Sequence, residues 1–191
     1  LYPKVRSIET VELLPFLAQN QGLFAAHNFD YLKDPRVRLV QGDGRHFLAA
    51  TAKTYDIISV NVLDPYLPGS SSLYTVEFWK LARERLNAGG TYAQLFWGKD
   101  LPLLVKGLQS IFPSALYFPA YGGTAYNVVA FHAPQDPAAL RPRLERLDAR
   151  ARQALQAILG GAAQAQFNEL LPQAWRLRQE FSAAAQAAPG P

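Results

Sequence analysis

The stretch that decides the fold spans residues 55–65 and is YDIISVNVLDP. Its mostly apolar residues 57–60 predict a buried strand that ends at Asn61. Asp64 follows in a loop, 64–72, that is rich in Pro, Gly and Ser. Polar residues after a buried strand favour a site, because ligands in open α/β sheets bind beyond the carboxyl ends of the strands.

Strands and helices alternate on both sides of this stretch. We expect strands at 5–11, 37–40, 57–60, 91–97 and 127–132, and helices at 15–24, 45–52, 75–86 and 101–111. Gly89-Gly90 is interpreted as the stop signal of the third helix, and the Pro- and Gly-containing segment after 111 as a turn. This order predicts an α/β fold with a mostly parallel sheet flanked by helices.

The composition changes near Gln135, which predicts a domain at 1–134 and an Ala- and Arg-rich helical tail at 135–191. Gly160-Gly161 divides the tail into two amphipathic helices, and Pro172 is expected to bend or split the second. We expect an apolar stripe in the first tail helix to be buried against the sheet domain or in a dimer contact. The stripe consists of Leu140, Leu144, Leu147 and Leu155.

Composition and charge bound the function classes. The chain has 49% hydrophobic and 18% charged residues, which favours a packed core. It has no Cys, and its three His residues are far apart, so we expect no metal site. The net charge of +4 comes with no nucleic-acid-binding motif, so no nucleic-acid partner is expected. No apolar run approaches the ~20 residues of a membrane span, and we expect a cytoplasmic protein. The sequence contains no Met, so residues upstream of Leu1 are expected.

Four polar residues fall at or just beyond predicted strand ends: Glu12, Asp43, Asn61 and Asp64. One acid in this position can accept both ribose hydroxyls of a nucleoside, and a second can accept from an adenine amino group. Each acid alone also fits a helix cap or a turn. We expect the four to converge at one sheet edge, within about 15 Å, or half the length of a 20-residue helix.

Five motifs in this order resemble the spermidine synthases, or polyamine aminopropyltransferases. They are VELLP at 11–15, QGDG at 41–44, YDIISVNVLDP at 55–65, LYTVEFW at 73–79 and FPAYGG at 118–123. The resemblance covers residues 5–132. The spacing and the Ser-rich loop are closer to bacterial spermidine-synthase-like proteins, some of which are fused to membrane domains.

The resemblance implies a class I methyltransferase-like (Rossmann-like) fold that binds decarboxylated S-adenosylmethionine. By position, Glu12 would hold the ribose, with Glu9 as the alternative. Asp43 and Gly44 belong to the motif that would hold the adenine. The resemblance implies no metal, and we expect a homo-oligomer.

The resemblance also implies transfer of an aminopropyl group to putrescine or a similar polyamine. Asp64 would hold the charged end of the amine, and Tyr121 would contact it by packing or through its hydroxyl. Asn61 stands where the family has its general base, and an Asn side chain cannot accept the proton of an attacking amine.

Two further departures accompany Asn61. The family's glycine-rich loop and N-terminal hairpin would precede Leu1, and Leu14 takes the place of an acid that often follows the ribose ligand. Three functions therefore stay open: an aminopropyltransferase, a non-catalytic nucleoside-binding relative, and a methyltransferase that uses S-adenosylmethionine.

Overall fold

The computed structural model describes residues 4–62, 65–97, 101–120, 124–136 and 163–187. The chain forms two compact units, Leu1–Ala52 and Lys53–Pro191. None of the described helices is both long enough and apolar enough to cross a bilayer.

The described part of the first unit contains a parallel strand pair and short helices. In chain order these are β1 (Ile8–Glu12), α1 (Pro15–Gln19), the 3-10 turns η1 (Gln21–Phe24) and η2 (Tyr31–Lys33), β2 (Val37–Gln41) and α2 (Gly44–Ala50). The register of β1 and β2 runs from Ile8 opposite Val37 to Glu12 opposite Gln41. The helix expected at 15–24 is interrupted after Gln19, and a 3-10 turn replaces its second half.

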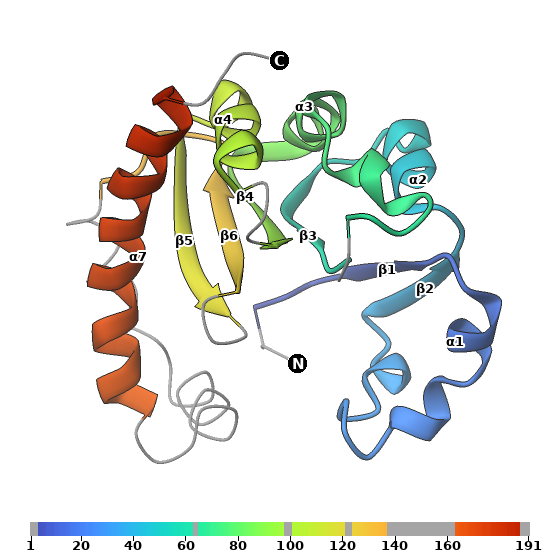
Figure 1. Ribbon diagram of the computed structural model, residues 1–191. Coiled ribbons are helices and arrows are strands. Elements are labelled where there is room, and N and C mark those ends of the chain that lie inside the picture. Colours follow the sequence, from blue (N-terminus) through green and yellow to red (C-terminus); the bar gives the residue numbers. More distant parts are fainter. Residues whose placement is uncertain (1–3, 63–64, 98–100, 121–123, 137–162, 188–191) are drawn as a thin grey trace. The chain divides into compact units, whose positions relative to one another are not determined.

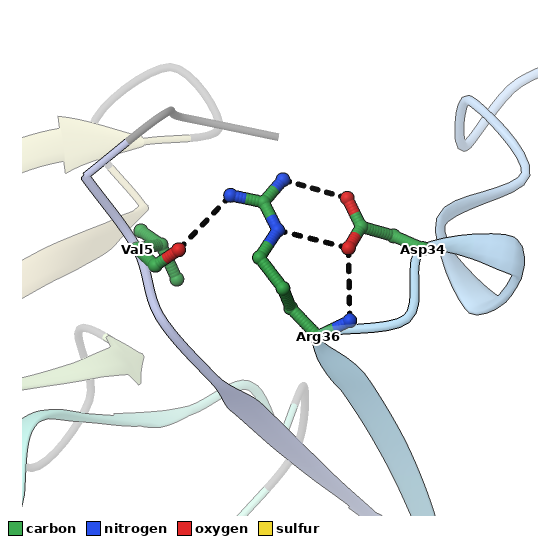
Figure 2. A network of polar contacts seen from close by, with 3 residues as sticks. All are labelled: Val5, Asp34 and Arg36. Atoms are coloured by element: carbon green, nitrogen blue, oxygen red, sulfur yellow. Dashed lines mark hydrogen bonds and ion pairs between the residues drawn. The ribbon is translucent and has the colours of Figure 1, made fainter.

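Arg36 ties the segment before β1 to the turn before β2 (Figure 2). Its Nε and Nη2 donate to the two carboxylate oxygens of Asp34 at 2.9 and 2.6 Å. Its Nη1 donates to the carbonyl of Val5 at 2.9 Å. The guanidinium holds the pKa of the Asp34 carboxyl well below its usual range, mainly through these side-chain hydrogen bonds.

The second unit is built on a four-stranded sheet of order β3-β4-β6-β5. Its described elements are β3 (Tyr55–Val60), η3 (Ser70–Leu73), α3 (Val76–Glu84), β4 (Leu86–Trp97), α4 (Leu101–Ile111), β5 (Ser114–Ala120), β6 (Ala125–Phe131) and α7 (Ala163–Ala187). β3 and β4 are parallel, whereas β6 is antiparallel to both β4 and β5. The predicted α/β class is confirmed. The described strands pair in parallel between β1 and β2 and between β3 and β4, but the two pairings of β6 make the four-stranded sheet mixed and not mostly parallel.

Two segments differ from the sequence prediction. Residues 114–120, expected to form a turn, are strand β5. Gly89-Gly90 lies inside β4 and does not end α3, which already ends at Glu84. The register with β3 shifts here, from Tyr55 opposite Leu86 to Ile57 opposite Thr91. Gly89 has φ of 80°, a conformation that favours glycine, so the pair forms an irregularity in the strand.

Aromatic side chains dominate the core of the second unit. The largest fully buried side chains are Trp79, Tyr92, Tyr117, Phe78, Phe96, Phe112, Leu108, Val105 and Val128. They come from α3, α4 and the strands, and Phe112 directly follows α4, so both helices pack on the sheet. The core places the carboxyl ends of β3 and β4 on a rigid support.

Helix α7 lies along β5 in the second unit (Figure 1). The Phe181 ring meets those of Tyr117 and Tyr126 edge-on, at centroid distances of 5.2 and 5.0 Å. On α4, Gln109 donates to the Ser182 hydroxyl at 2.7 Å. The helix continues through Pro172, so the expected split does not occur. The stripe expected in the first tail helix lies outside the described residues, and the boundary at 134/135 stays a prediction.

Candidate functional site

Glu12 and Asp43 follow adjacent parallel strands of the first unit. Glu12 is the last residue of β1, and Asp43 comes two residues after Gln41, the last residue of β2. The amide of Gly42 donates to the Glu12 carbonyl at 2.9 Å, so the strand pairing continues to the site. Both carboxylates therefore belong to the carboxyl edge of one strand pair, where α/β proteins bind ligands.

Each of these carboxylates uses one oxygen for a local contact. Oε1 of Glu12 accepts from the Leu14 amide at 2.8 Å, which fixes the backbone before α1. Oδ1 of Asp43 accepts from the His46 amide at 2.8 Å and caps α2. Among the described residues, no hydrogen bond or ion pair occupies Oε2 of Glu12 or Oδ2 of Asp43. An ionised carboxylate offers about four acceptor sites, so both can take a ligand's donors as well.

Glu9, the alternative ribose ligand, occupies a different environment. It lies near the amino end of β1, opposite Arg38 of β2. Its Oε1 accepts from Arg38 Nη1 at 3.0 Å, and its side chain is only 8% exposed. Glu9 is buried and paired with Arg38, whereas Glu12 is the last residue of β1. Glu12 is therefore the better placed of the two to contact a ligand at the strand end.

The remaining predicted residues belong to other segments. Gly44 is the exposed first residue of α2. Asn61 directly follows β3 and is exposed. Asp64 and Tyr121 lie outside the described residues. The convergence of the four strand-end residues stays a prediction, since Glu12 and Asp43 belong to the first unit and Asn61 to the second.

A buried polar cluster behind the end of β3 was not predicted. Gln94, on β4, is only 3% exposed. Its Oε1 accepts from Trp79 Nε1 at 2.9 Å and from the Tyr92 hydroxyl at 2.6 Å. Its Nε2 donates to the carbonyl of Leu73 at 3.1 Å. Burial raises the pKa of the Tyr92 phenol well above its ordinary value, so the phenol stays neutral and can donate. A glutamine within the apolar run 91–97 was the available sequence signal.

Metal chemistry has no support in the part of the chain that the structure describes. There, no group of three or more His, Cys, Asp or Glu residues could hold an ion.

Known proteins match part of the chain. Residues 12–97 match the family described as the spermine/spermidine synthase domain. The chain is 33% identical over 125 residues to polyamine aminopropyltransferase 2 of Streptomyces coelicolor, covering 58% of this chain and 22% of that protein. It is 32% identical over 128 residues to a Synechococcus polyamine aminopropyltransferase, covering 61% and 40%. This chain is similar to the spermine/spermidine synthase domain over residues 12–97. It is a distant homologue of the polyamine aminopropyltransferases over part of its length, as the motifs predicted.

Solved structures show the same fold. A spermidine synthase in complex with the transition-state analogue AdoDATO aligns with a TM-score of 0.63 at 16% identity, covering 73% of this chain and 53% of that one. Human methyltransferase-like protein 13 in complex with SAH aligns with a TM-score of 0.57 at 20% identity, covering 87% and 71%. The predicted α/β, methyltransferase-like fold is thereby confirmed. The family match includes Glu12, Asp43, Asn61 and Asp64, whereas Tyr121 lies beyond it.

Proposed function

We propose that the chain is part of an aminopropyltransferase. It would move the aminopropyl group of decarboxylated S-adenosylmethionine to a polyamine such as putrescine. The observation that carries the proposal is the pair of strand-end carboxylates, Glu12 and Asp43, each with one oxygen fixed by a backbone amide and the other open.

The nucleoside part of this co-substrate fits the first unit. The two vicinal ribose hydroxyls are donors that one carboxylate can accept, which is the role proposed for Glu12. The adenine amino group is a donor for Asp43, next to Gly44. A Cβ at Gly44 would meet no atom within 4 Å, so the backbone there is open to a flat base. Because the local hydrogen bonds already orient both carboxylates, binding needs little side-chain ordering.

Residues of the second unit are proposed to bind the polyamine substrate. In the reaction, the amine nitrogen attacks the carbon next to the sulfonium, the carbon–sulfur bond breaks and the amine loses a proton. Asp64 is proposed to hold the distal ammonium by a charge-assisted hydrogen bond, and Tyr121 to pack beside the amine. Asn61 can orient the attacking nitrogen through its carbonyl oxygen but cannot take the proton.

Asn61 also supports a second candidate, a non-catalytic nucleoside-binding relative. A positioned general base contributes about 10²–10⁴-fold to such a reaction, so its absence favours slow transfer or none. Both candidates require the nucleoside contacts at Glu12 and Asp43, and they differ only in turnover.

The test separates binding from turnover. Calorimetry with decarboxylated S-adenosylmethionine and with S-adenosylmethionine measures affinity for the wild type, Glu12→Gln and Asp43→Asn. Glu84→Gln, an exposed carboxylate on α3, is the control. Each site variant should bind about 10-fold or more weakly, since hydrogen bonds to charged groups are worth about 1.5–3 kcal/mol, whereas the control should match the wild type.

Turnover is followed by mass spectrometry of putrescine, cadaverine and spermidine reactions. Aminopropylated product supports the transferase. Binding without product supports the non-catalytic relative. Methylated product from S-adenosylmethionine would indicate a methyltransferase, and equal affinity of all variants would refute the carboxylate site.

A further inference from the structure

Tyr74 connects two segments of the second unit through its hydroxyl. It lies between η3 and α3, and its side chain is buried. The phenolic oxygen is 2.8 Å from the carbonyl oxygen of Val62 and 2.9 Å from that of Leu95. Val62 follows the candidate residue Asn61, and Leu95 lies on β4.

The two carbonyls lie just past the end of the strand pairing. The last register pair of β3 and β4 joins Val60 to Gln94. A phenol donates a single proton, so the two carbonyls share it. Beyond this pair, the backbone hydrogen bonds of the sheet no longer join β3 to β4. The Tyr74 hydroxyl makes the connection there instead, between the backbone after β3 and β4.

Tyr74 is itself held in place by its neighbours. Gln94 Nε2 donates to the carbonyl of Leu73 at 3.1 Å. The hydroxyl of Thr75 accepts from the Phe78 amide at 3.2 Å and caps α3. The Tyr74 ring lies 6.0 Å from the Phe96 ring. These contacts give the hydroxyl a fixed position from which it can orient a less regular segment.

We propose that Tyr74 is a positioning residue that sets the backbone of Asn61 and Val62 at the carboxyl end of β3. The inference rests on the proposed function, because Asn61 is assigned there to the amine side of the reaction. Tyr74 acts on Asn61 through the carbonyl of the next residue, Val62. Removing its hydroxyl should loosen the segment after β3 while the apolar core keeps its shape.

Tyr74→Phe removes the hydroxyl and keeps the buried ring. The matched control is Tyr117→Phe on β5, whose hydroxyl is also buried but meets no partner with hydrogen-bond geometry among the described residues. Val62-Leu63 is the one Val-Leu pair in the sequence. Carbonyl-¹³C valine with ¹⁵N leucine therefore gives a single carbonyl–amide correlation, which reports the Val62 carbonyl.

The carbonyl signal should move upfield in Tyr74→Phe and stay in place in Tyr117→Phe. An unchanged signal in a folded Tyr74→Phe variant overturns the inference. The wild type gives an independent readout that does not depend on folding of the variant. With ¹³Cζ-tyrosine in mixed H₂O and D₂O, a slowly exchanging Tyr74 hydroxyl gives two resolved carbon signals, and one averaged signal would contradict the shared hydrogen bond.

Steady-state kinetics test the positioning role. Tyr74→Phe should raise the KM for putrescine by about 2- to 12-fold, the range of one lost hydrogen bond. Affinity for the nucleoside, measured by calorimetry, should not change. An unchanged KM in a folded, active variant overturns the positioning role. If the wild type turns over no amine, the proposed transferase fails, and the carbonyl and hydroxyl signals still decide whether Tyr74 holds the segment.

Discussion

Replacing Gly107 with alanine tests the packing that supports the candidate site. Gly107 lies on α4 where this helix meets α3. A Cβ at Gly107 would lie 2.7 Å from Cζ3 of Trp79 and 3.4 Å from Cγ2 of Val76. Carbon atoms attract best at about 3.5–4.0 Å, so the alanine requires a shift of close to 1 Å in one of the helices or in the Trp79 ring.

Trp79 has little freedom to make that shift. Its side chain is 1% exposed, and its Nε1 is hydrogen-bonded to Gln94. Overpacking a core costs about 1–3 kcal/mol, and alanine regains about 1 kcal/mol of helix propensity over glycine. The difference is a net loss of about 0–2 kcal/mol in the free energy of unfolding. Because Trp79 is buried and hydrogen-bonded, we expect the upper half of this range, about 1–2 kcal/mol. The Tm should fall by about 2–8 °C.

Thermal and urea unfolding of Gly107→Ala measure this loss. Gly44→Ala is the control, since it also places alanine in a helix but its Cβ would meet no atom within 4 Å. The control should be as stable as the wild type or slightly more stable. In a Trp79→Phe background, which removes the clashing ring, the cost of Gly107→Ala should shrink. A cost that is equal in both backgrounds, or no cost at all, would refute the reasoning.

Three further predictions concern single side chains. Asn61→Asp should raise aminopropyl transfer to putrescine about 10²-fold by supplying a general base, and mass spectrometry showing no gain would assign the proton transfer to another residue. Arg36 lowers the pKa of Asp34 below its ordinary value of 3.8, so the stability from this pair is present above that value and is lost as the pH falls through the lowered pKa. Circular dichroism between about pH 5 and pH 1 should show a steeper loss in the wild type than in Asp34→Asn, and equal slopes would exclude the pair as a source of stability. Tyr117→Phe should change the free energy of unfolding by less than about 1 kcal/mol, and a larger loss in urea unfolding would reveal a hydrogen bond at its hydroxyl.

Much of the fold followed from local patterns. The β-branched residues of β2 and β3 and the apolar periodicity of α4 placed these elements within a few residues of their observed bounds. The strand-end acids were also visible, because Glu12 and Asp43 each follow a run rich in β-branched residues and precede a helix by a few residues. Such signals depend on residues close together in the sequence.

Strand β5 was missed because its sequence resembles a turn. Pro119 lies inside it, and proline cannot donate to a strand ladder. At the edge of the sheet only one neighbour, β6, has to be paired, so the proline is tolerated there. The position of a strand in its sheet is a tertiary property that local patterns do not contain.

The pair Gly89-Gly90 is compatible with two different structures, the end of a helix and an irregularity within a strand. Two glycines after a helical pattern are typical of a helix stop, but here they allow β4 to bend against β3. A Cβ at Gly90 would lie 2.9 Å from the carbonyl oxygen of Asn87 and 3.2 Å from that of Asp56. The backbone of β3 approaches a tight bend of β4 closely, which explains the glycine. Asn87 reinforces this approach by donating to the Asp56 carboxylate at 2.8 Å. Only the strand pairing distinguishes the two interpretations.

The structural and functional interpretations of the strand-end acids are compatible. Glu12 and Asp43 each act as a cap or turn residue through one carboxylate oxygen. That contact restricts the orientation of the side chain. Its second oxygen is then left open to a ligand. A ligand that meets an already oriented carboxylate loses less conformational entropy on binding. The local hydrogen bond that favours a structural role for the acid would thus also orient the acid for the nucleoside proposed above.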